Sequence, residues 1–418
     1  MIVKSVVYLQ GMKILELLIP IIAMPFVIRA YGMGGLGLVV LAQVVSQYLI
    51  MIGDWGFNAT ATKEFSAPKV KYLKWSVLFR DVQRVKILYL LALIPVLILL
   101  IFLSVVDAFV LLGFYLLVAS SVLQIRWFFQ ARFKLAQLMC VSAIFRVVYL
   151  CFVLFWLSPD TPIVVYVLFL ALPSFSLFVY SNIYFMINVV SRVRNTRYCA
   201  SGCCFGHSSS IFKLMLKDGW YLVNSRVLSA LVSPAFMYAG KVVYGLEFVG
   251  FMGVAQRIVS ACITVSQPVI DVVFPVMANS LSKGRGVWVV YRTAFVVLGF
   301  SFLFCAMIFL GGGEILQLLE VPYSPYQFMY LSVVSILIPI SLLNSLYAHA
   351  LVAVGRTKYI VRSTVVGCLL GGLFFWVVHR FGVQEVSIAV SIVVLQSCML
   401  VGLLYFFVSS GLKGRGGV

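Results

Sequence analysis

ILYLLALIPVLILLIFLSVV, residues 87–106, contains no charged side chain. A helix needs about 20 mostly apolar residues to cross the hydrocarbon core of a bilayer. Asp107 follows, and then residues 108–125, AFVLLGFYLLVASSVLQI, form a second apolar run. The segment therefore predicts two membrane-spanning helices, 86–106 and 108–125, joined by a tight turn.

The rest of the chain repeats this pattern. Of its 418 residues, 63% are hydrophobic and only 10% are charged. A water-soluble protein with this composition would leave a large apolar surface in water, so we expect an all-α integral membrane protein. Further apolar stretches bring the number of predicted spans to about twelve. The other ten are 6–28, 36–54, 138–157, 163–187, 219–239, 249–272, 287–310, 326–348, 363–378 and 386–408.

The basic side chains predict the orientation of these spans. Lys and Arg number 31 against 12 Asp and Glu, which gives a net charge of +19. With the N-terminus inside, most of the basic residues fall in inner loops, above all in 57–85 and 188–218. Lys86 is placed there too. Cytoplasmic loops are enriched in Lys and Arg, so both termini are predicted to be cytoplasmic. No basic patch interleaved with aromatic residues indicates nucleic-acid binding.

A set of residues occurs twice, 213 positions apart. An even number of spans per half gives the two halves the same orientation, related by an axis along the membrane normal. The predicted domains are a six-helix lobe at 1–190, a cytoplasmic linker at 191–218 and a second six-helix lobe at 219–418, with a substrate pathway between the lobes. The glycines of the first copy are expected to let the first two helices approach closely. The matches are Tyr31-Gly32, Gly37 and Ala42-Gln43 against Tyr244-Gly245, Gly250 and Ala255-Gln256, and a weaker echo pairs Arg132-Phe133-Lys134 with Arg356-Thr357-Lys358.

Arg226 and Arg257 are the strongest candidates for binding a substrate. Each lies about 10 Å deep in a predicted span at 1.5 Å per residue, too deep for simple snorkelling. Guanidinium groups pair with phosphate oxygens in a bidentate fashion, so the two arginines would suit a diphosphate head group. The alternative is a structural ion pair with a carboxylate elsewhere in the bundle.

Carboxylates inside spans are the second group of candidates. Lys13 and Glu16 share a helix face, where Glu16 either couples proton movement and contacts sugar hydroxyls or simply pairs with Lys13. Asp54 and Asp271 are predicted to end the second and eighth helices at equivalent places. They either gate the cytoplasmic mouth by pairing with basic residues or form hydrogen bonds at the helix ends. Arg146 is predicted to be peripheral, snorkelling or contacting anionic lipid.

Uncharged polar residues on the same helices complete the candidate site. Asn224, Gln43 and Gln256 would form hydrogen bonds with sugar, or else hold helices together. No nucleotide-binding loop or catalytic triad is present, so a transporter is expected rather than an enzyme. Neither a cofactor nor a metal is expected, because the spacing of Cys199, Cys203, Cys204 and His207 fits no common zinc pattern.

Two segments carry a resemblance to a known family. Arg29-Ala30-Tyr31-Gly32 through Gly37, followed by Asp54-Trp55-Gly56-Phe57-Asn58, resembles the first helical hairpin of Wzx-type O-antigen flippases. These belong to the polysaccharide-export branch of the superfamily that includes MATE exporters. The resemblance implies a V-shaped pair of lobes and a cationic central cavity lined by the first, second, seventh and eighth helices.

The same resemblance implies a function. The substrate would be a short oligosaccharide on undecaprenyl diphosphate, moved across a bacterial inner membrane by alternating access. A proton or sodium gradient would drive it, and membrane lipid, a polysaccharide polymerase and a chain-length regulator would be partners. Three alternatives stay open. A MATE-like drug or cation antiporter predicts a dominant buried carboxylate, a peptidoglycan-precursor flippase usually has more spans, and a membrane glycosyltransferase or polymerase would show a catalytic acidic pair or a large outer loop.

Overall fold

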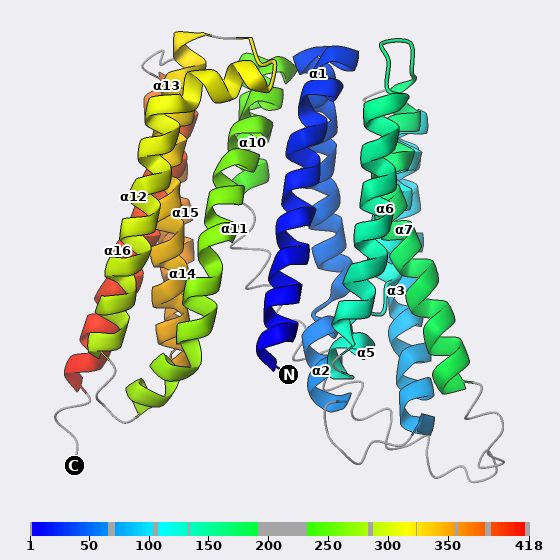
Figure 1. The fold of residues 1–418 in the computed structure, drawn as a ribbon, viewed down its shortest axis with the longest axis horizontal. Helices are drawn as coiled ribbons and strands as arrows, with labels where there is room; N and C mark the ends of the chain where they lie inside the picture. The colour runs from blue at the N-terminus through cyan, green and yellow to red at the C-terminus, as the bar shows by residue number, and fades with distance from the viewer. Residues whose placement is uncertain are drawn as a thin grey trace. The chain divides into compact units, whose positions relative to one another are not determined.

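The described part of the chain consists of helices joined by short turns and connecting segments in the computed structural model (Figure 1). It comprises residues 2–65, 72–102, 108–132, 134–190, 232–282, 287–322, 324–354, 356, 358–380 and 386–413. No strand occurs among these residues, which confirms the predicted all-α membrane fold. The helices are α1 (Ile2–Asp54), α2 (Phe57–Phe65), α3 (Tyr72–Phe102), α4 (Ala108–Leu123), α5 (Arg126–Ala131), α6 (Leu135–Phe155), α7 (Ile163–Phe185) with a π-helical turn (Met186–Val190), α10 (Val232–Tyr244), α11 (Leu246–Ser282), α12 (Val287–Leu318), α13 (Pro325–Ser335), α14 (Leu337–Ala353), α15 (Lys358–Arg380) and α16 (Val386–Lys413).

Ten stretches of the described residues are long and apolar enough to cross a membrane. The first of them, Glu16–Asp54, has 39 residues and would extend for about 58 Å as one helix, roughly twice the thickness of the hydrocarbon core. Gly32 interrupts it with φ 69° and ψ 179°, a conformation that strongly favours glycine. The stretch is therefore two spans. The seventh predicted span, 219–239, is described only from residue 232, so the count agrees with about twelve.

Several helices extend beyond the spans predicted from hydropathy. The segments 57–85 and 273–286 were expected to be connecting loops, but α2 and the first turns of α3 occupy the former, and α11 continues to Ser282. The hydropathy windows missed these regions because they contain charged residues. One helix face is nevertheless buried, as Leu78 and Val82, four residues apart, show by packing in the same core.

The predicted span 326–348 is two helices with a break at Ile336. Pro339 lacks an N–H group and therefore cannot donate to the carbonyl oxygen of Ser335, four residues earlier. The Cys305 thiol of α12 donates to that oxygen instead, at 3.3 Å. A neighbouring helix thus satisfies the carbonyl group that the proline frees.

By their internal contacts, the residues form two units. Unit 1 consists of the described residues within Met1–Ile19 and Ala42–Val227, and unit 2 of those within Pro20–Leu41 and Leu228–Val418. Segment 20–41 thus groups with the second unit. The linker 191–218 lies outside the described residues, and the predicted domain boundaries stay a prediction.

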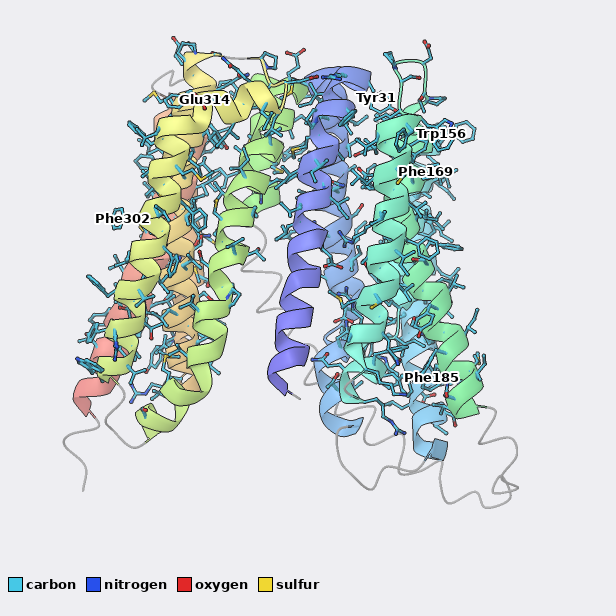
Figure 2. All side chains as sticks on the ribbon, viewed as in Figure 1. Tyr31, Trp156, Phe169, Phe185, Phe302 and Glu314 are labelled. Atoms are coloured by element: carbon cyan, nitrogen blue, oxygen red, sulfur yellow. The ribbon has the colours of Figure 1, made fainter. Side chains whose placement is uncertain are left out.

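Aromatic side chains make up the core at one end of unit 1. Trp127, Phe129 and Phe185 are fully buried there, and Figure 2 labels Phe185 on α7. The Phe185 ring stacks on that of Phe79 with 4.4 Å between centroids. This cluster fixes α2, α3, α5 and α7 against one another. By contrast, Phe302 on α12 is 66% exposed and points away from its own unit (Figure 2), as a lipid-facing side chain would.

The 213-residue repeat has a structural counterpart within unit 2. Gly32 and Gly245 both have positive φ angles, 69° and 87°. A Cβ atom on Gly37 would overlap the carbonyl oxygen of Leu246, and a Cβ atom on Gly250 would overlap the carbonyl oxygen of Met33. Met33 and Leu246 are themselves equivalent positions of the repeat. The contact is therefore reciprocal. Gly37 permits a close approach to the start of α11, rather than the approach between the first two helices that we expected.

The weaker sequence match, of 132–134 with 356–358, also has a structural counterpart. Its residue alignment differs from the one that the sequence suggested. Lys134 N donates to Phe129 O at 2.8 Å, and Arg356 N donates to Leu351 O at 2.8 Å. Lys134 is therefore equivalent to Arg356, whereas the sequence match paired it with Lys358. The same type of turn after a helix end recurs in both units, and this geometry determines the correct alignment.

Candidate functional site

Glu16 of α1 is held by α6. Arg146 Nη2 lies 3.4 Å from Glu16 Oε1, and Arg146 Nη1 donates to the backbone oxygen of Glu16 at 3.0 Å. Ser142 Oγ donates to the same carboxylate at 3.2 Å. The peripheral role predicted for Arg146 is therefore wrong, because this arginine faces α1. The side chain of Lys13, the predicted partner, lies outside the described side chains.

This cluster leads to a stability prediction. We expect Glu16→Ala to destabilise the protein by about 1–3 kcal/mol, because Arg146 loses its charged partner inside the membrane. The effect is moderate, since the two side chains keep 22% and 29% of their surface exposed. Thermal unfolding in detergent measures it, with the double variant Glu16→Ala/Arg146→Leu expected to recover most of the loss. Equal stability of wild type and Glu16→Ala would contradict the pairing.

Asp54 closes α1 and faces Lys86 of α3. Lys86 Nζ lies 3.9 Å from Asp54 Oδ1 and donates to Gln124 O at 3.5 Å. Only 1% of the Lys86 side chain is exposed, against 15% for Asp54. The prediction that Lys86 lies in a cytoplasmic loop is therefore wrong. Lys86 is a buried cation, and the basic partner expected for Asp54 is present, while the gating role of Asp54 stays a prediction.

The residues after Asp54 form a sharp turn into α2. Trp55 and Gly56 have φ angles of 46° and 70°, and Trp55 N donates to Ile52 O at 3.1 Å. Gly56 adopts this left-handed conformation without steric strain because it has no Cβ atom. Asp54 thus ends its helix as expected. Asp271 does not, because α11 continues to Ser282, so the two aspartates do not occupy equivalent helix ends. The Asp271 side chain lies outside the described side chains.

The structure describes only some of the other candidate binding residues. Arg257 and Gln256 lie on α11, where Arg257 is half-buried and Gln256 is exposed, and Gln43 is half-buried on α1. Arg226 and Asn224 lie outside the described residues. The roles of the candidates in binding therefore stay predictions.

Two polar pairs in unit 2 were not found by sequence reasoning. Gln267 Nε2 donates to Ser345 Oγ at 3.0 Å and joins α11 to α14. Asn344 Nδ2 donates to Gln396 Oε1 at 2.9 Å and joins α14 to α16. Such side-chain hydrogen bonds hold helices together where lipid offers no alternative partner. A polar residue in an apolar span was the available signal, but the sequence does not say which helix faces it.

Arg29 and Glu320 form an exposed ion pair in unit 2. The guanidinium donates through Nε and Nη2 to the two carboxylate oxygens of Glu320. The hydrogen bond from Arg29 lowers the pKa of Glu320 below its ordinary value of 4.5. The pair is therefore intact at neutral pH, and its contribution is lost only as the pH falls through that lowered value.

Basic side chains outnumber acidic ones inside the candidate spans of the described residues. Glu16 and Asp54 each face a cation in unit 1, and Arg257 adds a further positive charge in unit 2. Among the described residues, no group of His, Cys, Asp or Glu could hold a metal ion. Many spanning helices with ionisable residues on their protein-facing sides are typical of membrane transporters.

The sequence comparisons define the family. The model of the family described as "Polysaccharide biosynthesis protein" matches residues 2–281, which is more than half of the chain. The chain belongs to this family. It is also similar to a "Putative O-antigen transporter" of Escherichia coli (strain K12), with 30% identity over 84 residues. That match covers 19% of this chain and 20% of the relative, so the chain aligns with only about a fifth of that protein's length.

Solved structures share the fold over nearly the whole chain. An inward-facing multidrug resistance MATE family transporter of the MOP superfamily has a TM-score of 0.69 at 13% identity, with 97% of this chain and 96% of that chain covered. The lipid II flippase MurJ in an inward closed conformation has a TM-score of 0.68 at 12% identity, with coverages of 98% and 89%. These structures show the fold, that of a multi-pass helical membrane protein, and with the family they confirm the resemblance to Wzx-type flippases.

Proposed function

We propose that the protein is a flippase that moves an oligosaccharide linked to undecaprenyl diphosphate from the cytoplasmic to the periplasmic leaflet of a bacterial inner membrane. The family supports a role in polysaccharide biosynthesis. The observation that carries the proposal is the excess of Lys and Arg over Asp and Glu inside the candidate spans, where Glu16 and Asp54 each face a cation. A surplus of guanidinium charge favours an anionic substrate.

The proposed transport step needs two kinds of contact. The diphosphate accepts hydrogen bonds from Arg257 and Arg226, while Asn224, Gln43 and Gln256 bind sugar hydroxyls. The isoprenoid chain stays in the lipid, and alternating access exposes the head group on the other side, driven by a proton or sodium gradient. Both termini are cytoplasmic in this proposal, and the released product is passed to a polysaccharide polymerase and its chain-length regulator.

A cation-coupled drug antiporter is the second candidate, because a MATE transporter shares the fold. It would require a membrane carboxylate available to a cationic substrate or coupling ion. Glu16 instead faces Arg146 and Ser142, and Asp54 faces Lys86. Neutralised carboxylates are poor sites for a cation, so the flippase is the better interpretation.

Substitution of Arg257 tests the proposal. In a deletion strain complemented with Arg257→Ala, we expect surface polysaccharide to fall by about tenfold to hundredfold, because one charge-assisted contact to the diphosphate is lost. Lipid-linked oligosaccharide should accumulate on the cytoplasmic face at unchanged protein level. Arg257→Lys should recover part of the transport. Arg292→Ala serves as the control, since Arg292 is exposed on α12.

Two outcomes would overturn the proposal. Normal surface polysaccharide with Arg257→Ala removes the electrostatic basis for head-group binding. Resistance to cationic drugs that depends on the protein, without any change in surface polysaccharide on deletion, would assign it to the antiporters. Rescue of the deletion strain by flippases of known substrate would then identify the sugar.

A further inference from the structure

An apolar groove runs between α6 and α7 on unit 1. It has a volume of about 640 Å³ and is lined by Ile144 and Phe145 of α6, by Leu172, Phe175 and Ile183 of α7, and by Ile187 of the π-helical turn that follows, among others. Ile144, Ile183 and Ile187 are 61%, 53% and 63% exposed. The groove therefore opens on the outer surface of the unit and has the apolar lining that a hydrocarbon chain requires.

The length of the groove limits the kind of chain. Its lining on α7 and the π-helical turn extends from Leu172 to Asn188, which is about 24 Å at 1.5 Å per residue. One leaflet contributes about 15 Å to the hydrocarbon core, so the groove accommodates the acyl chain of a phospholipid together with its glycerol region. An eleven-isoprene chain is considerably longer than one leaflet and would leave most of its length outside.

One end of the groove carries a positive charge. Tyr184 lines this end, and Lys134 Nζ donates to its hydroxyl oxygen at 2.8 Å and lies 5.5 Å from its ring centre. Lys134 is exposed and directly precedes the first residue of α6, where the helix dipole adds positive potential. An ammonium group has three donors, so others are available for an anion. No charged residue lines the groove itself.

We propose that this groove binds an anionic phospholipid, with one acyl chain along α7 and the phosphate on the Lys134 ammonium. The apolar walls explain the affinity for the chain, and the cation at one end explains the preference for a negative head group. This site lies within unit 1 and does not depend on the proposed transport function. Asn188, at the same end, adds a polar side chain beside the glycerol region.

Native mass spectrometry of the full-length protein in detergent tests the head-group contact. Phosphatidylglycerol and phosphatidylcholine with identical chains are added separately, and the occupancy of the first bound lipid is compared. We expect wild type to prefer phosphatidylglycerol, and Lys134→Ala to reduce that preference about fivefold, the effect of one basic residue near a lipid surface. Lys358→Ala, at an exposed residue that begins α15, should keep the preference. An unchanged preference in Lys134→Ala would overturn the proposal.

A second pair of variants tests the chain contact. Ile183→Trp fills the groove and should reduce phosphatidylglycerol binding, whereas Leu168→Trp, on the same helix at a 44% exposed residue outside the lining, should not. Equal binding by the two variants would show that the chain does not occupy the groove. Undecaprenyl phosphate is added as a competitor. If undecaprenyl phosphate displaces phosphatidylglycerol from wild type at equal concentration, the groove binds the isoprenoid lipid and the proposal is wrong.

Discussion

Gly37→Ala is expected to lower the thermal stability of the protein strongly and to abolish transport. The new Cβ atom would overlap the carbonyl oxygen of Leu246 and would lie 2.9 Å from the backbone nitrogen of Gly250. Both neighbours are backbone atoms, which cannot move away as a flexible side chain can. Overpacking of this kind costs at least about 1–3 kcal/mol. Gly250→Ala should have a similar effect, because its Cβ atom would overlap the carbonyl oxygen of Met33.

Gly34→Ala is the matched control. The nearest atom to its Cβ position is Cγ of Glu247 at 3.8 Å, an ordinary van der Waals contact with the flexible part of a side chain. We expect wild-type stability and surface polysaccharide from this variant. Stability is followed by thermal unfolding in detergent, and transport by surface polysaccharide in a deletion strain. If Gly37→Ala behaves like Gly34→Ala in both assays, the close backbone contact between Gly37 and the start of α11 is not required.

The same glycines show what the sequence could and could not predict. The recurrence of Gly32 and Gly37 at Gly245 and Gly250 predicted two related halves, and Gly32 and Gly245 both have positive φ angles. The partner of Gly37 was not predictable. Spacing along one helix identifies a narrow face, but Leu246 lies more than 200 residues away, and a single sequence does not show which distant backbone approaches.

The charged residues inside the spans show the same limit: their positions were predictable from the sequence, but their partners were not. The position of Glu16 inside an apolar run predicted an intramembrane carboxylate, but its partner Arg146 comes from a different helix. Lys86 directly precedes the uncharged run 87–106 and was therefore assigned to a loop. Helix α3 begins at Tyr72 instead, which brings Lys86 into its interior turns. Hydropathy locates the apolar core of a span but neither its helix ends nor its protein-facing side.

Asp54→Ala is expected to be one of the most destabilising single substitutions in unit 1. It leaves the Lys86 ammonium, which is 1% exposed, with only the carbonyl oxygen of Gln124 at 3.5 Å. Removal of one partner from a buried ion pair costs about 3–5 kcal/mol, because the remaining charge is desolvated without compensation. We therefore expect a marked fall in folded protein and in the midpoint of thermal unfolding. Arg84→Ala, an exposed residue on the same helix, should have little effect.

The reverse substitution should be milder. In Lys86→Met, the carboxylate of Asp54 loses its cation but is 15% exposed, so water or a proton can compensate. The double variant Asp54→Asn/Lys86→Met should recover most of the stability, since apolar or neutral replacement of both partners is often close to neutral. If it instead recovers stability but not surface polysaccharide, the pair has the gating role proposed for Asp54. If Asp54→Ala is no worse than Lys86→Met, then Lys86 is not held as a charged group in the interior, and the pair does not stabilise the fold.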